Sequence, residues 1–334
     1  MISVALAAYN GERFIREQLQ SIAAQSLPVD EVVICDDCST DQTAETAERF
    51  IRDNNLIGWQ VIAREKNIGY CMNFWDAIAR TSGNLIFLAD QDDVWLPERV
   101  AVMADMMGQH PEIWALSSRY TVIDGEGQPV KDLTGVTNVG KNFDGGIEPI
   151  TVESLIGCSY VRGFSLCFRR ELIPFLKPLE LSHLLAHDWY ICMQAALNGE
   201  CAFLNACLTR YRMHGRNVSL TAVSRKTLIG DREKRKEGLR ESVAAHETLL
   251  DPAEQYPHLR PIEKKHIRQL IKFEKRRLRF LETKNPFRWI VLLGGCKQYA
   301  RVYKSFTGGI KIWLGDFCYG YGINWNRSSR SGSV

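Results

Sequence analysis

An alternation of short apolar runs with amphipathic stretches over the first 110 residues is the feature that most constrains this fold. The apolar runs lie at 3–9, 31–37, 59–63 and 84–90, and the stretches between them have helical periodicity. We expect helices over 12–25, after Ser39-Thr40-Asp41, over about 72–81, and from Pro97. Continuously apolar strands that alternate with helices predict a parallel sheet covered on both faces. The sequence therefore predicts an α/β fold.

Polar residues gather where each predicted strand ends. In parallel sheets, ligands bind beyond the carboxyl ends of the strands, so these residues are the candidates for a binding site. They are Ala8, Tyr9, Asn10, Gly11 and Glu12 after the first strand, Asp36 and Asp37 at the end of the second, Asn67, Ile68 and Gly69 after the third, and Asp90, Gln91, Asp92 and Asp93 after the fourth.

Three carboxylates, those of Asp90, Asp92 and Asp93, fall within four residues. They repel one another, and a helix cap needs only one of them, so a divalent cation is the simplest explanation. No GxGxxG or GxxxxGK[ST] loop follows the first strand, so a bound phosphate must be neutralised by metal instead. An Asp-x-Asp at the end of a strand is the expected device, with one carboxylate on the cation and the other on ribose or a metal-bound water. For Asp93 we expect a role as a cap or outer group of the helix from Pro97, and for Asp41 a cap.

Four ordered motifs carry a family resemblance: AAYNGERFIREQLQSIAAQS, DEVVICDDCSTDQT, NIGYCMNFWDAI and LIFLADQDDVWLPERV. Together they resemble family 2 of the inverting nucleotide-sugar glycosyltransferases, and the resemblance covers about residues 2–220. Later segments fit as well, namely VRGFSLCFRREL (161–172), HDWY (187–190) and YRMHGRNVS (211–219). The resemblance implies the type A glycosyltransferase (GT-A) fold, with a Rossmann-like, mostly parallel sheet. Cys38 stands where the family usually has Gly or Asn.

The resemblance also implies a nucleotide-sugar site. Asp37 would accept the N3–H of a pyrimidine, so the donor would be a UDP- or dTDP-sugar. Backbone groups of Ala8 and Tyr9 would frame the base and ribose, and Gly69 would permit close backbone approach. The full implied set is Ala8, Tyr9, Asn10, Glu12, Asp37, Asn67, Gly69, Asp90, Gln91 and Asp92.

The metal and the catalytic base follow from the same resemblance. Asp90 would face ribose or a metal-bound water, while Asp92 and His214 would ligate Mn²⁺ or Mg²⁺. Asp188 would be the general base, because inversion needs one carboxylate to take a proton from the acceptor hydroxyl. Trp95 and Trp189 would stack on the acceptor sugar, although burial is nearly as good an explanation for both.

Two other classes of function stay open at this point. A nucleotidyltransferase also uses a strand-end aspartate pair, but it normally has a Gly-rich loop with a basic residue, which does not follow Ala8. A non-catalytic nucleotide-sugar or glycan-binding protein would need neither Asp188 nor a metal. Release of UDP or dTDP in the presence of an acceptor separates the three classes.

Charge divides the chain in two. Residues 1–224 hold 18 basic and 28 acidic groups, whereas residues 225–334 hold 24 and 11. We therefore expect a catalytic domain over 1–224, with a nucleotide-sugar half (about 1–115) and an acceptor half (116–224). We expect a basic helical region over 225–334, with helices at 225–250 and 261–282. A region this basic attracts polyanions such as phospholipid head groups.

The basic region leads us to expect a peripheral membrane protein on the inner face of the cell membrane. No apolar run approaches the roughly 18–20 residues that span a bilayer, and the N-terminus reads as a strand rather than a signal peptide. Trp289, Ile290 and Leu292 would enter the membrane surface. The alternative is a helix pair packed back on the catalytic domain. A nucleic-acid partner is not expected.

The segment DQDDVW (90–95) resembles the rhamnosyltransferase-like branch of the family. The resemblance implies dTDP-rhamnose as the first donor to test and UDP-galactose or UDP-glucose as the next. It also implies a glycan or polyprenyl-diphosphate-linked acceptor in bacterial surface polysaccharide assembly, such as that of O-antigen.

Overall fold

The computed structural model describes residues 1–130, 145–156, 161–176, 186–215, 217, 232–250, 259–292, 313–318 and 321. These residues form two compact units. Unit 1 holds the described residues up to His214 except Ile156, and unit 2 holds Ile156 and the described residues from Gly215 onward. The boundary expected at residue 224 lies outside the described residues.

Unit 1 is built on one sheet, which has nine strands among the described residues and the order β3-β2-β1-β4-β8-β6-β9-β5, with β7 paired to β9. The first four strands are parallel to one another, while β8 runs antiparallel to both β4 and β6. The strands are β1 (Ile2–Ala8), β2 (Glu31–Asp36), β3 (Trp59–Ala63), β4 (Leu85–Asp90), β5 (Val94–Trp95), β6 (Ile113–Ile123), β7 (Ile147–Pro149), β8 (Leu166–Arg169) and β9 (Glu200–Arg212).

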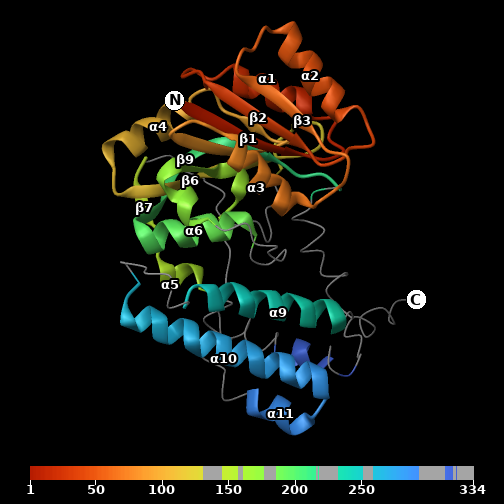
Figure 1. Cartoon of the computed structure of the whole chain (residues 1–334), viewed down its shortest axis with the longest axis vertical. Coiled ribbons are helices and arrows are strands. Elements are labelled where there is room, and N and C mark those ends of the chain that lie inside the picture. Colours follow the sequence, from red (N-terminus) through yellow and green to blue (C-terminus); the bar gives the residue numbers. More distant parts are fainter. Residues whose placement is uncertain are drawn as a thin grey trace, which may run out of the picture. The chain divides into compact units, whose positions relative to one another are not determined.

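Helices cover both faces of this sheet (Figure 1). Alternate strand residues such as Val4, Leu6 and Phe87 form a buried core with α1, α2 and α4. On the other face, α3 packs on β1 and β2, and α6 packs on β6 and β9. The helices are α1 (Ile15–Ala23), α2 (Thr43–Asp53), α3 (Tyr70–Arg80), α4 (Arg99–Gln109), α5 (Val152–Leu155) and α6 (His187–Asn198), with 3₁₀ turns η1 (Gly163–Ser165) and η2 (Arg170–Phe175).

The predicted α/β fold with a large, mostly parallel sheet is confirmed. Some helices begin a few residues later than predicted, because the residues before them form turns. The carbonyl of Gly11 accepts hydrogen bonds from the N–H groups of Phe14 and Ile15, so α1 begins at Ile15 rather than at residue 12. Likewise, α4 begins at Arg99 rather than at Pro97.

Unit 2 is helical. It contains α9 (Arg232–Thr248), α10 (Pro261–Thr283) and α11 (Pro286–Val291). Residues 225–231 of the helix expected over 225–250 lie outside the described residues, whereas α10 matches the expected 261–282 closely. An apolar core that includes Leu239 and Phe280 holds the unit together. Among the described residues, no helix is both long and apolar enough to cross a bilayer.

One part of the membrane prediction is wrong. Leu292 is 1% exposed and belongs to the core of unit 2, so it cannot enter a lipid surface. Trp289 stacks on Trp313 with ring centroids 4.0 Å apart, and each indole N–H donates to the other residue's carbonyl. Of the three predicted residues, only Ile290 is exposed.

Candidate active site

The loops after β1 and β2 are tied to each other at the carboxyl edge of the sheet. Asn10, at a φ of 49°, donates its N–H to Ser39 Oγ (2.8 Å) and accepts from the N–H of Thr40 (2.8 Å). The Glu12 carboxylate accepts from the N–H of Gln42 (3.0 Å). Asn10 and Glu12, which we predicted to bind the nucleotide sugar, thus serve to fix these loops.

Gln91 fastens the segment after β4 to the end of β1. Its side-chain amide pairs with both backbone groups of Tyr9, at 2.7 Å and 2.8 Å. A Cβ on Gly11 would lie 2.2 Å from Gln91 Oε1, so a larger residue there would push the Gln91 amide away from Tyr9. The carbonyl of Ala8 accepts from the N–H of Asp37 at 2.8 Å. Ala8, Tyr9 and Gln91 therefore frame one edge of the predicted donor site.

Asp37, Asn67 and Gly69 form a second group at this edge. The buried Asp37 carboxylate accepts from the N–H groups of Ile68 (2.8 Å) and Gly69 (2.9 Å), and the Asn67 amide donates to the Asp37 carbonyl (3.0 Å). Gly69 has a φ of +85°, and the space beside its Cα is open. Cys38 has a φ of 63°, which explains why the family usually has Gly or Asn at this position.

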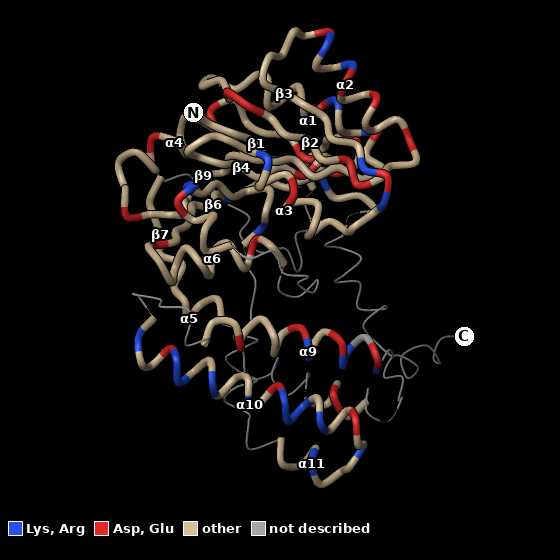
Figure 2. The backbone as a smooth tube through the Cα atoms, viewed as in Figure 1, with Lys and Arg blue, Asp and Glu red and all other residues tan. Residues whose placement is uncertain are grey.

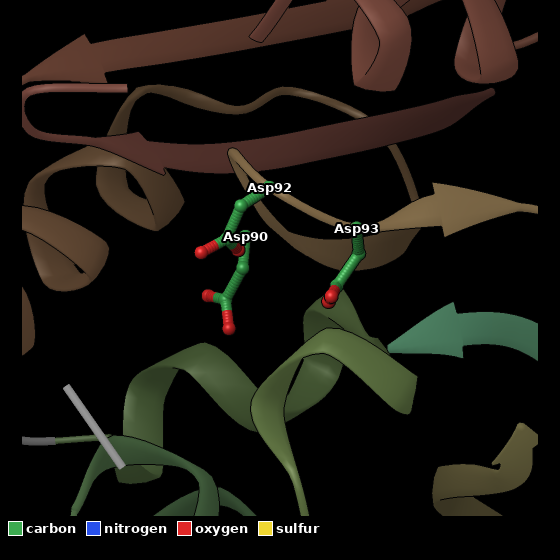
Figure 3. Close-up of side chains that lie close together, drawn as sticks. All are labelled: Asp90, Asp92 and Asp93. Atoms are coloured by element: carbon green, nitrogen blue, oxygen red, sulfur yellow. The ribbon is translucent and has the colours of Figure 1, made fainter. Parts of the chain in front are cut away.

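The acidic cluster after β4 consists of Asp90, Asp92 and Asp93, whose carboxylate oxygens lie within 4.8 Å of one another. Figure 3 shows all three side chains extending from the same short segment. Burial, together with the carboxylates of Asp92 and Asp188, raises the pKa of Asp90 to about 8. Burial and the carboxylates of Asp92 and Asp90 likewise raise the pKa of Asp93. The cluster is therefore short of positive charge.

His214 lies beside this cluster. Its Nε2 is 2.7 Å from Asp92 Oδ2, and its ring packs on Phe14 with centroids 4.9 Å apart. The fold thus brings His214 next to Asp92, which lies 122 positions earlier in the sequence. Oxygen ligands with an adjacent imidazole and a local deficit of positive charge suit a divalent cation such as Mn²⁺ or Mg²⁺.

Arg212 organises the cluster and was not found from the sequence. Its Nε donates to the Asp92 carbonyl (2.9 Å), its N–H to Asp93 Oδ1 (2.9 Å), and its guanidinium to Glu17 (2.6 Å). Asp93 therefore does not cap α4, where no side chain caps the first turn. The available signal was an arginine at the end of the largely apolar strand β9, two residues before His214.

Asp188 is the second residue of α6, and its Oδ2 accepts from the N–H of Gly163 at 3.1 Å. Its charge contributes to the raised pKa of Asp90, while Arg162 acts in the opposite direction. The predicted base therefore lies at the same edge as the acidic cluster, with Arg162 as the nearby countercharge. Sequence reasoning also missed Arg162.

The predicted stacking of Trp95 and Trp189 on a sugar does not hold in this structure. Trp95 is 2% exposed and lies under the Arg99 guanidinium, 4.1 Å from its ring centroid. Trp189 is fully buried, and its indole N–H donates to the Leu155 carbonyl at 2.8 Å. Neither ring presents a face to a ligand, so burial explains both residues.

A family comparison identifies the family of this chain. The Glycosyl transferase family 2 profile matches residues 3–170, about half of the chain. The chain therefore belongs to glycosyl transferase family 2, and its fold is the GT-A fold.

Two curated relatives illustrate how far the sequence similarity extends. Protein Rv1520 of Mycobacterium tuberculosis is 27% identical over 220 residues, which cover 65% of this chain and 60% of that protein. The match thus spans less than two thirds of the relative. The putative teichuronic acid biosynthesis glycosyltransferase TuaG of Bacillus subtilis is 23% identical over 66% of this chain and 81% of its own.

Solved structures show the same fold. The S. aureus TarS 1–349 complex with UDP-GlcNAc has a TM-score of 0.60 at 20% identity and covers 97% of this chain and 93% of that one. The mannosyltransferase PcManGT from Pyrobaculum calidifontis, in complex with GDP-Man and Mn²⁺, has a TM-score of 0.55 at 17% identity over 98% and 87%.

The raised pKa of Asp90 predicts how the metal-free protein responds to pH. An unfolded Asp titrates near 3.9, so the folded state holds a proton that the unfolded state loses between about pH 4 and pH 8. Stability in EDTA should therefore fall as pH rises through this window, and Mn²⁺ should raise Tm more at pH 8 than at pH 5. Thermal unfolding checks both trends. In the Asp90→Asn variant, the loss of stability with rising pH should be smaller. An unchanged loss would contradict the raised pKa of Asp90.

Proposed function

We propose that the protein is a metal-dependent inverting glycosyltransferase that moves a sugar from a UDP- or dTDP-sugar to a glycan or lipid-linked glycan. The observation that carries this proposal is the convergence of Asp188 with the Asp90–Asp92–His214 group at one sheet edge of a family 2 fold. A single base opposite a leaving group is what one-step inversion requires.

In this proposal Asp188 takes the proton from the acceptor hydroxyl as that oxygen attacks the anomeric carbon. The Gly163 N–H holds the carboxylate, and Arg162 supplies a positive charge near it. Asp92 and His214 would hold Mn²⁺ or Mg²⁺, which when bound supplies positive charge for the diphosphate leaving group. Arg212 fixes the backbone that carries Asp92.

The nucleotide proposal rests on Asp37. Its carboxylate already accepts two backbone hydrogen bonds, and each oxygen retains a lone pair that could accept the N3–H of uracil or thymine. TarS with UDP-GlcNAc and PcManGT with GDP-Man share the fold, so the fold alone does not select the base. dTDP-rhamnose, from the DQDDVW segment, is the first donor to test, followed by UDP-hexoses.

The acceptor proposal draws on the relatives. TuaG is named for teichuronic acid synthesis, and TarS for adding N-acetylglucosamine to poly(ribitol phosphate). By analogy, the acceptor here is a bacterial surface polysaccharide or its polyprenyl-linked precursor.

We further propose that the basic region 225–334 holds the protein on the inner face of the cell membrane. Its excess of 24 basic over 11 acidic groups supports this location. A basic group near an anionic leaflet contributes about 1 kcal/mol, so several together give reversible attachment.

Asp188→Asn tests the base. Asparagine keeps the size of the side chain but cannot take the proton, so transfer should fall by roughly 10²-fold or more with little change in donor affinity. This effect is measured as the release of nucleotide from each of a panel of nucleotide sugars in the presence of a glycan acceptor. Asp53→Asn on the exposed side of α2 is the matched control and should retain full activity. Loss of donor binding with transfer intact would make Asp188 a positioning residue.

Asp37→Ala tests nucleotide choice. Loss of the carboxylate leaves one base edge unpaired and should weaken UDP and dTDP binding by about 1–3 kcal/mol, measured by calorimetry with Mn²⁺ present. GDP binding, expected to be weaker in the wild type, should change less. GDP binding as tight as that of UDP and dTDP in the wild type would refute this role.

Membrane attachment predicts a response to salt. The full chain should sediment with phosphatidylglycerol-containing vesicles at low ionic strength and bind more weakly near 1 M salt, where screening shortens to about 3 Å. Pure phosphatidylcholine vesicles are the control. Absence of binding to the anionic vesicles would remove the membrane proposal and leave the transferase proposal intact.

A further inference from the structure

One face of α10 carries an exposed row of basic side chains. Arg268, Lys272 and Arg276 recur every four residues, and Lys275 and Arg279 lie beside them. Figure 2 shows these positive positions repeating along the helix. Like charges at this spacing weakly oppose helix formation, and a compensating anion would relieve this repulsion.

The acidic residues nearby do not supply it. Glu263 and Glu274 of α10 are buried, and they bond to Arg260 and to Ser242 respectively. Exposed Glu247 pairs with Lys275 (2.5 Å), and Glu282 pairs with Arg240 (3.2 Å). In the part of unit 2 that the structure describes, no acidic partner is found for Arg268, Lys272, Arg276 or Arg279.

The same side chains, together with Glu247 and Glu282, line a groove of about 790 Å³, which we call the α10 groove. Leu250, Ile271 and Leu278 contribute its apolar part. The groove therefore presents positive charge next to an apolar surface, and this combination matches an anionic amphiphile better than a free ion.

A second apolar surface follows directly in the chain. Phe287, Ile290 and Val291 of α11 are 75%, 52% and 59% exposed, while their neighbour Trp289 is turned inward onto Trp313. Three large apolar side chains on one short helix are costly in water and are typical of segments that enter the boundary of a bilayer.

We propose that the α10 groove binds the phosphate groups of anionic phospholipids, while Phe287, Ile290 and Val291 enter the apolar layer of the same bilayer. This inference rests on the membrane attachment proposed above and assigns it to particular residues. Charge complementarity selects the phosphate, and the adjacent apolar surfaces select a lipid over a soluble polyanion.

The test compares two double variants of the full chain with equal charge loss on the same helix. Lys272→Gln with Arg276→Gln removes groove residues, and Lys264→Gln with Lys265→Gln removes exposed lysines that do not line the groove. Co-sedimentation with phosphatidylglycerol vesicles should weaken roughly 25-fold for the groove pair and less than about fivefold for the control pair. Equal losses would mean diffuse attraction and would overturn the groove assignment.

A second variant tests the apolar part without touching the groove. Ile290→Ser with Val291→Ser alters only exposed positions, so folding should persist, and the vesicle binding that survives high salt should disappear. Unchanged salt-resistant binding would refute insertion of α11. Two other results would overturn the lipid assignment. In the first, the groove variant loses binding to inorganic polyphosphate but still binds vesicles. In the second, the wild type is a dimer and the groove variant is a monomer. Failure of vesicle binding by the wild type would instead refute attachment itself.

Discussion

Four carboxylates, those of Asp90, Asp92, Asp93 and Asp188, converge at the carboxyl edge of the sheet against their mutual repulsion. Two such charges about 4 Å apart repel by about 4 kcal/mol at an effective dielectric constant of 20, so the surrounding structure must hold them in place. Arg212 does this from β9 through the backbone and side chains around the cluster. Burial and, after it, this repulsion raise the pKa values of Asp90 and Asp93. A bound cation would relieve the repulsion.

The sheet edge and its residues were accessible from sequence because they depend on local pattern. Apolar strands end in polar residues, and parallel strands bring those ends together, which is why Asp37, Asn67 and Asp90 could be grouped in advance. Family membership then favours a glycosyltransferase over the nucleotidyltransferase and binding-protein alternatives.

What could not be predicted depends on distant packing. Arg212 contacts Glu17 across 195 residues of sequence, and no local pattern encodes such a pairing. The same holds for Trp189, which looked available for a sugar but donates to the Leu155 carbonyl. In unit 2, Trp289 is a residue type that often anchors proteins in membranes, but its ring stacks on Trp313. Its neighbours Phe287 and Val291 are exposed instead.

The contact between Gly11 and Gln91 bears on how this family can change its sequence. A side chain at position 11 would push the end of the Gln91 side chain aside, so its amide could no longer pair with Tyr9. The cost of such a substitution is the loss of the two hydrogen bonds that fasten the segment after β4 to the end of β1. Positions 11 and 91 are 80 residues apart, yet the size of the residue at one limits what the residue at the other can do.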